Sequence, residues 1–536
     1  MDNTRSKGQS GKRWWPLAAG VVVVGLAAAA CGGGDETGGG AQAGGAVAIR
    51  LTGDWDTLDP ALSINENGEV VSGFVYDNLL SLDDKGEAAP YLANTWKQAG
   101  TAITFDVRTD ATCSDGTKLT PEAIAGSLKR TFDPATKAPL VKRYFGEGPF
   151  TVTADASAHT VTVDLGKPHN TTALYGFTQP VTAIVCPAGL KDPAKLETGG
   201  IGSGPYTLTS STHGQGVELA VRKDWAWGPQ GSKAADAGFP SAVHFKVVDN
   251  DTTAANLLLT GGLDIGRVGG TDVPRLKANK DLIYQPSNNV SLQVLVFNQG
   301  AKHATADPAV RQALMMVVNP KEYIKAAFNG LAVGSTNLII PDRPCYDENV
   351  GKLLPDNDLD QARKVLENAG YTRGADGKFS KNGKPLTMEL LGNLTFGNGP
   401  DYIASQFEAL GVTTKLDKLD QGTYLDKLTH GTFDSAIHPA LYASLAQSIA
   451  AFLGDPPPDG TNYANVTSAA AAQQYTAALA ATSQDEQCGH LIEAESDFIR
   501  TSAMLPLASI TFNWFGKQTT FGADGSYVKG WSIRRK

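Results

Sequence analysis

The sequence predicts an α/β protein built from several layers. Three observations carry this prediction: apolar residues recur at helical spacing in some segments, they alternate with polar residues in others, and no repeat of fixed period runs along the 536 residues. Hydrophobic residues make up 41% of the chain and charged residues 19%, which supplies large cores and excludes a disordered chain. A chain of this length is expected to form about two to four domains.

The charge balance excludes one broad class of partner. The chain has 46 Lys and Arg against 55 Asp and Glu, a formal net charge of −9. A strongly cationic nucleic-acid binder is therefore excluded, and no nucleic-acid partner is expected.

Residues 1–30 are predicted to be a signal peptide. Basic residues come first, followed by an apolar run of 14 residues from Leu17 to Ala30 that ends at Cys31. A membrane-spanning helix takes about 20 residues, so a retained span is disfavoured. Small residues on both sides of Cys31 are similar to a bacterial lipobox, although Ala28 stands where Leu is usual. Cys31 is the predicted lipidation site, and an ordinary cleaved signal with an incidental cysteine is the alternative.

Residues 31–45 are predicted to be the lipidated cysteine and a flexible tether. The stretch GGGDETGGGAQAGG has no periodic apolar residue, and random-coil scaling gives it a reach of about 20 Å. The mature body is therefore expected to begin near Ala46 and to work outside the cytoplasm, tied to the outer face of the cell membrane.

The four remaining cysteines are Cys113, Cys186, Cys345 and Cys488. An even count in an exported protein favours disulfides, and four cysteines allow three pairings. Buried free thiols are the alternative. No two of the four are close in sequence, so no metal site is expected.

Several secondary-structure elements are signalled by capping residues and by apolar periodicity. One expected helix begins at Thr120–Pro121, with Ile124, Leu128 and Phe132 on one face, and a second begins at Asp307–Pro308, with Val310, Leu314 and Val317 on one face. A third runs from near Asp358 to Gly370. A fourth contains Ile403, Phe407 and Leu410 and ends at Gly411. Ile103–Arg108 and Thr160–Leu165 alternate as half-buried strands do, and Ser291–Asn298 is apolar enough for an interior strand.

The sequence is poor in catalytic motifs. It lacks the phosphate-binding Gly-x-x-x-x-Gly-Lys-Ser/Thr loop, the His-Glu-x-x-His zinc helix and the Gly-x-Ser-x-Gly elbow. His430 and His438 could serve a soft cation, but we expect solvated loop histidines. Ser526 and Lys529 form one Ser-x-x-Lys within the last eleven residues, without the companion motifs. Binding is therefore the predicted class, and a secreted serine hydrolase centred on Ser526 is the alternative from another class.

Nine short segments, in order along nearly the whole mature chain, follow the pattern of one family. They are LDPALS (58–63), VYDNLLSLDDKGEAAPYLANTW (75–96), ITFDVRTDATCSDGTKLTPEAIAGSLKRTFDP (103–134), GSGPYTL (202–208), GGLDIG (261–266), VFNQ (296–299), DPAVRQALMMVVNPKEYI (307–324), LDQARKVLENAGY (359–371) and GTFD (431–434). The series resembles the family 5 extracytoplasmic solute-binding proteins, which deliver oligopeptides, dipeptides, nickel complexes and other solutes to ATP-binding-cassette (ABC) importers.

The resemblance implies a periplasmic-binding-protein-like class II clamp, with two lobes on a hinge and an inserted third domain. Lobe one would comprise residues 46–69, 199–289 and 506–536, the inserted domain 70–198, and lobe two 290–505. In this division Cys113 and Cys186 share the inserted domain and Cys345 and Cys488 share lobe two, so we favour these two pairs.

The same resemblance implies a function without a covalent step. The chain is expected to be the membrane-anchored solute-binding component of an ABC importer, neither an enzyme nor dependent on a cofactor. Its partners would be a small solute or peptide, ABC permease subunits with separate ATPase chains, and the membrane through the lipid anchor. A monomer is expected.

Oligopeptide is the default ligand, but one family feature is missing. In peptide-binding relatives an Asp shortly after the Gly-Thr-Phe-Asp strand pairs with the α-ammonium group of the ligand. Here Ala443 stands at about that place, and residues 438–454 contain no acidic residue before Asp455. Either another carboxylate supplies the pairing, or the ligand lacks a free amino terminus. The alternative ligand is therefore a non-peptide solute such as an oligosaccharide, a siderophore or a nickel chelate.

Tyr442 is the leading candidate for a ligand contact, because it offers an apolar face and one hydroxyl. Asn65, Asn298 and Trp514 are further candidates from their places in or beside the matching segments. Each has a structural alternative: Tyr442 as core, Asn65 as turn former, Asn298 as strand-end cap and Trp514 as packing.

Overall fold

The structure is a computed structural model of the chain. It describes residues 44–83, 86–166, 171–198, 201–341, 343–441, 444–457, 460–481 and 483–536. The predicted signal peptide, Cys31 and most of the predicted tether lie outside the described residues, as do Tyr442 and Ala443. Gly44, near the end of the predicted tether, is already part of the fold, because its N–H donates to the carbonyl of Phe239 at 2.9 Å.

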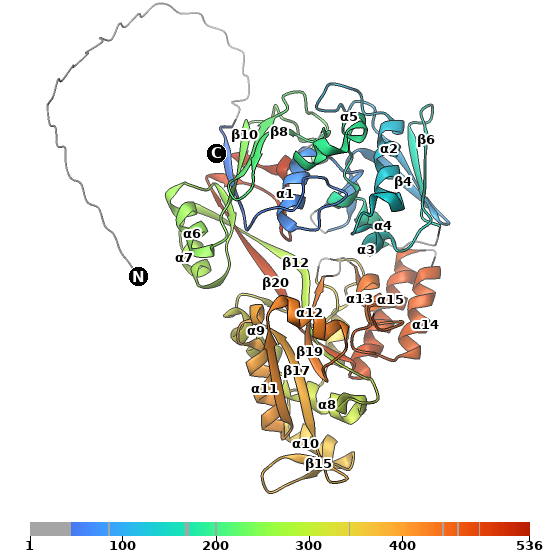
Figure 1. The fold of residues 1–536 in the computed structure, drawn as a ribbon, viewed down its shortest axis with the longest axis vertical. Coiled ribbons are helices and arrows are strands. Elements are labelled where there is room, and N and C mark those ends of the chain that lie inside the picture. Colours follow the sequence, from blue (N-terminus) through green and yellow to red (C-terminus); the bar gives the residue numbers. More distant parts are fainter. Residues whose placement is uncertain are drawn as a thin grey trace, which may run out of the picture. The chain divides into compact units, whose positions relative to one another are not determined.

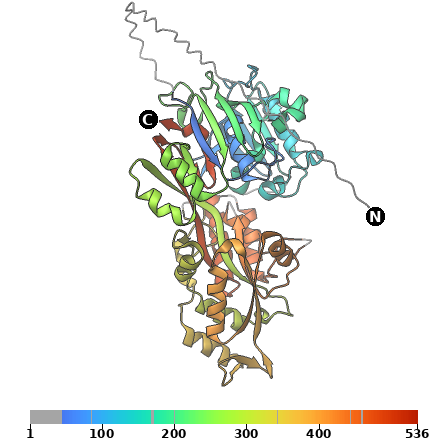
Figure 2. The same cartoon turned by 60° about the vertical axis from the view of Figure 1, so that its left-hand side comes forward.

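One large mixed sheet runs through the described part of the chain. In spatial order its strands are β18 (Thr413–Leu419), β17 (Thr387–Asn393), β19 (Ser435–Leu441), β12 (Leu282–Phe297), β20 (Met504–Lys517), β11 (Ile265–Arg267), β1 (Val47–Leu51), β10 (Ala242–Val247), β9 (Gly216–Val221) and β8 (Tyr206–Thr212), and β13 (Val333–Gly334) also pairs with β20. Figure 2 shows β1 beside the green strands β8–β10.

β12 and β20 join the two parts of this sheet, and Figure 1 shows them running alongside each other. The first half of β12 pairs with Thr511–Lys517 of β20, and the second half pairs with Met504–Ser509. β20 also pairs with β11, Trp514 opposite Arg267, whereas β12 pairs with β19 at its other end. The expected interior strand is confirmed, and both predicted lobe crossings, at 289–290 and 505–506, fall inside these two strands.

Smaller sheets complete the strand content of the described residues. A four-stranded sheet has the order β4 (Ala93–Ala99), β5 (Ala102–Val107), β7 (Thr160–Asp164) and β6 (Thr151–Asp155). The others are β2 (Leu80–Leu82) with β3 (Ala88–Pro90), β14 (Thr372–Arg373) with β15 (Phe379–Lys381) and β16 (Lys384–Pro385), β21 (Thr519–Thr520) with β24 (Arg534–Arg535), and β22 (Ala523–Asp524) with β23 (Tyr527–Val528). β5 and β7 confirm the two strands expected from alternation.

The α-helices cover the sheets. They are α1 (Glu66–Val75), α2 (Pro121–Phe132), α3 (Val141–Phe145), α4 (Thr171–Gly176), α5 (Pro187–Lys191), α6 (Asp251–Thr260), α7 (Val273–Lys277), α8 (Pro308–Val317), α9 (Pro320–Phe328), α10 (Leu359–Asn368), α11 (Gly399–Leu410), α12 (Gln421–Thr429), α13 (Leu445–Ala450), α14 (Ala469–Ala480) and α15 (Gln484–Arg500).

All four expected helices are confirmed, and their caps explain where they begin and end. The side chains of Thr120, Asp307 and Asp358 accept hydrogen bonds from backbone N–H groups in the first turns of α2, α8 and α10. Gly411 ends α11 with a φ of 113°, a conformation that a side chain would resist.

Buried apolar residues form two large cores and one small one. The first core draws only on residues between Leu292 and Ala508, and therefore lies within or next to the predicted lobe two. The second core combines residues of the predicted lobe one and of the predicted inserted domain. Phe74, for example, packs edge-on against Phe245 with ring centres 5.0 Å apart. Residues 70–198 thus share a core with lobe one, and the predicted boundary at 69–70 falls inside α1.

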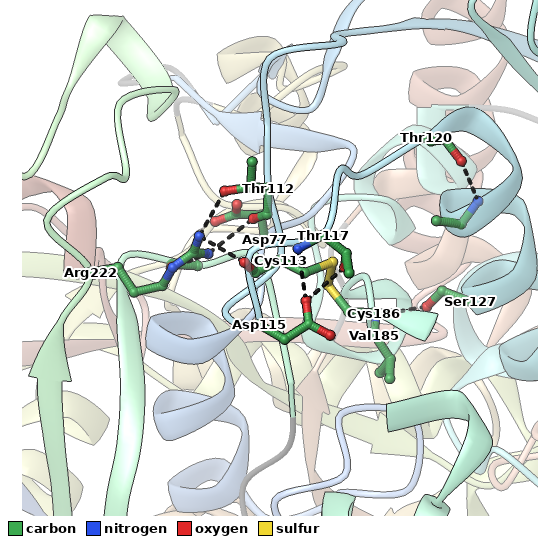
Figure 3. The surroundings of a disulfide bond; sticks show 12 residues. Asp77, Thr112, Cys113, Asp115, Thr117, Thr120, Ser127, Val185, Cys186 and Arg222 are labelled. Atoms are coloured by element: carbon green, nitrogen blue, oxygen red, sulfur yellow. Dashed lines mark hydrogen bonds between the residues drawn. A yellow bond between two sulfur atoms is a disulfide. The ribbon is translucent and has the colours of Figure 1, made fainter. Parts of the chain in front are cut away.

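Two disulfides join the four cysteines of the body. Cys113 bonds to Cys186 and Cys345 to Cys488, with S–S distances of 2.04 and 2.00 Å. Around the first disulfide, Arg222 donates to the carbonyl oxygens of Thr112 and Cys113 at 3.0 and 3.1 Å (Figure 3). This loop is therefore fixed both covalently and by a buried guanidinium.

Within the described ranges, no helix combines the length and the apolar character that crossing a lipid bilayer requires.

Candidate functional site

A cavity of about 420 Å³ lies where segments of both large cores meet β12. We call it the hinge cavity. Its lining is mostly polar or charged and consists of Asp83, Gly86, Gln230, Gln285, Pro286, Ser287, Ile340, Pro341, Arg343, Gly522, Ala523, Asp524, Lys529, Trp531 and Ser532. A mixed set of charges, amides and one indole suits a polar solute with some flat or apolar surface.

Arg343 bridges the hinge cavity from the side of the first core. Its Nη2 donates to the Asp524 carboxylate at 2.9 Å and its Nη1 donates to the carbonyl of Gly86 at 3.2 Å. The guanidinium carbon lies 5.8 Å from the centre of the Tyr175 ring. These partners all belong to the side of the second core, so one buried cation, with a side chain 6% exposed, connects both sides of the cavity.

The segment that carries Arg343 is fixed at several points, and we call Ser335–Asp347 the arginine segment. Asn337 Nδ2 donates to the carbonyl of Asp347 at 2.8 Å, and Ser448 Oγ donates to the carbonyl of Leu338 at 2.6 Å. The Leu338 N–H donates to Glu495 of α15, and the Cys345–Cys488 disulfide ties the other end to the same helix. Burial raises the pKa of the Glu495 carboxyl to about 7, and its two hydrogen bonds oppose this rise. The arginine segment is therefore positioned by α15.

A second, smaller cavity of about 120 Å³ adjoins the hinge cavity and shares Asp524, Lys529 and Trp531 with it. We call it the Glu69 cavity, after the acid of α1 that lines it. Glu69 is 9% exposed, and its Oε2 accepts a hydrogen bond from the Tyr527 hydroxyl. Burial raises the pKa of Glu69 to about 7, although the Tyr527 hydrogen bond and the Arg143 charge lower it.

Lys529 and Trp531 form the wall between the two cavities. Lys529 Nζ donates to the carbonyl of Leu82 at 3.1 Å and lies 5.9 Å from the centre of the Trp531 ring. The Lys529 side chain is therefore held at the wall, and the indole contributes lining to both cavities.

The residues singled out from the sequence occupy other places. Tyr442 lies outside the described residues. Asn65 caps α1 by accepting from the Asn67 N–H at 2.8 Å. Asn298 is fully buried and donates to the carbonyls of Gly431 and Phe433 at 3.2 Å. Trp514 is 3% exposed, and its Nε1 donates to the carbonyl of Gly525 at 3.0 Å. The structure therefore brings none of these three to the hinge cavity or the Glu69 cavity.

His430 and His438, the two histidines considered as cation ligands, lie in different environments. His430 is exposed at the end of α12, as expected, but the expectation of a solvated loop is wrong for His438. His438 lies in β19, 5% exposed, and burial lowers its pKa to about 4. Across the described ranges, no group of three or more His, Cys, Asp or Glu residues is placed to hold a metal ion.

The Ser-x-x-Lys pattern folds into a hairpin. Ser526 lies in the turn between β22 and β23, where Asp524 pairs with Tyr527. The same hairpin carries Asp524, Tyr527 and Lys529 to the two cavities. The sequence therefore drew attention to this segment only through the serine-hydrolase alternative, whereas the residues that line the cavities are the neighbours of Ser526.

A family-wide comparison matches most of the chain. The model of the family described as "Bacterial extracellular solute-binding proteins, family 5 Middle" matches residues 87–452. This range contains the arginine segment and all of β12, whereas Asp83 and Gly86 of the hinge cavity precede it and Gly522–Ser532 follow it.

Individual relatives match over similar lengths. The glutathione-binding protein GsiB of Escherichia coli strain K12 is 27% identical over 382 residues, 70% of each chain. A substrate-binding protein from Microbacterium hydrocarbonoxydans, solved with 4-hydroxybenzoate hydrazide, is 25% identical with a TM-score of 0.71, covering 92% of this chain and 100% of that chain. NikA from Brucella suis, solved with Fe(III)-EDTA, shares the fold with a TM-score of 0.77 at 20% identity and the same coverage.

Proposed function

The chain belongs to the family 5 bacterial extracellular solute-binding proteins, and on that basis we propose that it captures a solute in the hinge cavity and delivers it to an ABC permease. Its fold is the two-lobed clamp of its structural relatives, and it is a binding protein rather than an enzyme, as they are. Transport would be driven by ATPase chains separate from this one, and we expect the binding component to act as a monomer.

The observation that carries the proposal is the position of Arg343 across the hinge cavity. A solute bound there would contact residues of both lobes at once, since Arg343 comes from one side and Asp524 from the other. Only a ligand with different contacts in the open and closed states shifts the balance between them. β12 and β20 supply the hinge, because they are the strands that belong to both parts of the sheet.

An oligopeptide remains our default ligand. GsiB is described as a glutathione-binding protein, and it matches 70% of this chain. The polar lining of the hinge cavity suits the backbone amides of a short peptide.

A non-peptide solute is the second candidate, and an oligosaccharide, a siderophore and a nickel chelate remain within it. Two structural relatives were solved with 4-hydroxybenzoate hydrazide and with Fe(III)-EDTA. The acid-free stretch 438–454 favours this candidate as well, because it lacks a carboxylate for a peptide ammonium group.

We also propose that Cys31 carries a lipid after removal of residues 1–30 and that the tether holds the body near the outer face of the cell membrane. The extracellular character of the family supports an extracytoplasmic location.

The test is small-angle X-ray scattering combined with native mass spectrometry of the mature protein. Native mass spectrometry of the purified protein should reveal a retained solute: peptides of assorted sequence support the default, and one defined non-peptide mass supports the second candidate. Removal of that solute should increase the radius of gyration, and adding it back should reverse the change. Identical scattering curves with and without it, or consumption of the solute by the protein, would contradict the proposal.

A further inference from the structure

Glu69 is a buried acid that takes no part in the contacts of Arg343 across the hinge cavity. It lies on α1 and lines the Glu69 cavity, and its residue is nine-tenths buried. Tyr527 donates to Oε2, whereas the described residues give Oε1 no hydrogen-bond donor. A carboxyl oxygen that faces a cavity without a donor is a place where a ligand can supply one.

Other acids near Glu69 already have partners. Asp56 accepts from Ser63 Oγ and from the Ile64 N–H, both at 2.8 Å. Glu66 pairs with Arg267 at 2.7 Å, and Asp524 pairs with Arg343. Of these acids Glu69 is the most buried, and within the described residues its carboxylate forms no ion pair with a Lys or Arg side chain.

The charged and titratable groups around Glu69 come from several elements. Arg143 of α3 favours the ionised carboxylate, whereas Asp56 and Glu66 disfavour it. Lys529 and Asp524 line the same cavity, and the Tyr527 and Tyr144 hydroxyls, whose pKa values burial raises, lie within electrostatic reach of Glu69.

We propose that Glu69 binds a protonated amine of the solute, so that the amine-bearing end lies in the Glu69 cavity and the rest of the solute lies in the hinge cavity. This inference rests on the proposed function and narrows it to amine-bearing solutes such as peptides with a free amino terminus. A carboxylate of α1 would then replace the acid that the stretch around Ala443 lacks.

Charge and size both support this assignment. An ammonium group donates charge-assisted hydrogen bonds to a carboxylate, and such bonds are about twice as strong as neutral ones. The Glu69 cavity, at about 120 Å³, has room for an amine with a few attached atoms but not for a whole peptide. The shared residues Asp524, Lys529 and Trp531 provide continuity with the larger hinge cavity.

The amine should also displace a proton. Because burial raises the pKa of Glu69 to about 7, the empty site is partly protonated near neutral pH. An ammonium group favours the ionised carboxylate, so binding releases a proton and affinity rises with pH. Between pH 6 and pH 8 the ionised fraction of such a carboxyl grows roughly tenfold, whereas an α-amino group with a pKa near 8 loses about half of its ammonium form. We therefore expect the affinity for a free amino terminus to rise about three- to fivefold.

The experiment compares two peptide mixtures on the full mature chain. One is a peptic digest of casein, and the other is the same digest after complete N-acetylation with acetic anhydride. Peptides retained by the protein during ultrafiltration are counted by mass spectrometry at pH 6 and pH 8. The wild type should retain at least about tenfold more of the free-amine digest, and this preference should increase with pH.

Two variants separate the amine contact from folding. Glu69→Gln keeps the shape and an acceptor for Tyr527, so it should fold normally, which its melting temperature checks, but lose the preference for free amines. Glu122→Gln neutralises an exposed acid of α2 and should leave the preference unchanged.

Several results would overturn the inference. Equal retention of both digests by the wild type would exclude an amine contact, and so would an undiminished preference in Glu69→Gln. Tighter retention at pH 6 would mean that protonated Glu69 donates to the ligand instead. If neither digest is retained while a compound from a cell extract is, the amine assignment fails and the solute-binding function stands; if no compound is retained at all, the proposed function fails too.

Discussion

At the scale of single residues, Arg343 connects the two sides of the hinge cavity through one planar cation. A guanidinium donates in fixed, separate directions, which lets Nη2 reach the Asp524 carboxylate while Nη1 reaches the Gly86 carbonyl. Gly86 has a φ of +74°, and a Cβ atom there would come within 2.2 Å of Arg343 Nη1. The arginine and the glycine therefore depend on each other.

Replacing Arg343 by Met should lower the free energy of unfolding by about 1–2 kcal/mol, because Asp524 would keep a partly buried charge without its partner. The free energy of unfolding of Arg343→Lys should lie between those of the wild type and Arg343→Met, since one ammonium group cannot reach both acceptors. Urea unfolding followed by circular dichroism measures the change. The control is Arg500→Met, which breaks an exposed pair with Glu493 and should cost less than about 0.5 kcal/mol. A value for Arg343→Met within that limit would contradict the bridge.

Glu495 predicts a pH dependence of stability. Burial raises its pKa in the folded protein to about 7, above the ordinary 4.5. Between these values the folded state binds more protons than the unfolded state, so the contribution of Glu495 to stability decreases as pH rises. Above about pH 7 both states are ionised, and the cost stays constant at up to about 3 kcal/mol.

Glu495→Gln should remove this dependence. The stability of Glu495→Gln relative to the wild type should therefore be greater at pH 8 than at pH 4.5. Melting temperatures from pH 4.5 to pH 8 measure both proteins, and Glu493→Gln, an exposed neighbour on α15, is the control. Parallel curves for wild type and Glu495→Gln would show that Glu495 titrates normally.

At the scale of elements, α15 and the arginine segment act as one unit. α15 holds the segment through Glu495 at Leu338 and through Cys488 at Cys345. The Asn337 side chain closes the segment on itself at the Asp347 carbonyl. A helix of the first core thus determines where Arg343 meets the second core.

Removing the Cys345–Cys488 disulfide tests that unit. The bond joins residues 143 positions apart, and cross-links of this kind restrict the unfolded chain by about 2–5 kcal/mol. The double variant Cys345→Ala/Cys488→Ala should therefore melt at a lower temperature. It should also exchange amide hydrogens faster across Ser335–Asp347, as mass spectrometry of the exchanged peptides would show.

The matched control is Cys113→Ala/Cys186→Ala, which should destabilise the protein without accelerating exchange in the arginine segment. Unchanged exchange in the Cys345→Ala/Cys488→Ala variant would mean that hydrogen bonds alone position Arg343.

At the scale of the whole molecule, two large cores are linked by β12 and β20 and separated at the hinge cavity. The second core includes residues of the predicted lobe one and of the predicted inserted domain, 70–198, whereas the first core lies between Leu292 and Ala508. A hinge made of two paired strands allows the cores to move as units while their internal packing stays intact.

The proposed lipid anchor gives a prediction for the whole protein. Wild type expressed in its bacterial host should sediment with membranes and incorporate radiolabelled palmitate. Cys31→Ser should do neither, while its body, which is folded from Gly44 onward, should keep the melting temperature of the mature protein. Palmitate labelling of Cys31→Ser, or its full retention in membranes, would contradict the assignment.

Much of the local structure was predictable from the sequence. Thr120, Asp307 and Asp358 indicate where helices begin, because the side chain of a capping residue accepts a hydrogen bond from a backbone N–H only two or three residues away. Alternation marked β5 and β7 for a similar reason, since successive side chains of a strand point to opposite faces. The family was also recognisable, because its motifs are runs of neighbouring residues.

The site was not predictable in this way. Asn65 and Asn298 stood in matching motifs, yet their side chains cap a helix and bind backbone carbonyls. Arg343, Asp524 and Glu69 carry no local signature, because an ion pair or a buried carboxyl looks the same in sequence as a solvated one.

The sequence by itself determined the family and the helices and strands that caps and periodicity mark, and it predicts an export signal over residues 1–30. Only the tertiary structure decided which side chains share a cavity: Arg343 meets Asp524 across 181 residues, and Tyr527 meets Glu69 across 458. The physical reason is the distance along the chain over which each interaction acts. Caps and periodicity act over a few residues, whereas burial and ion pairing depend on segments that only the folded sheet and its two hinge strands bring together.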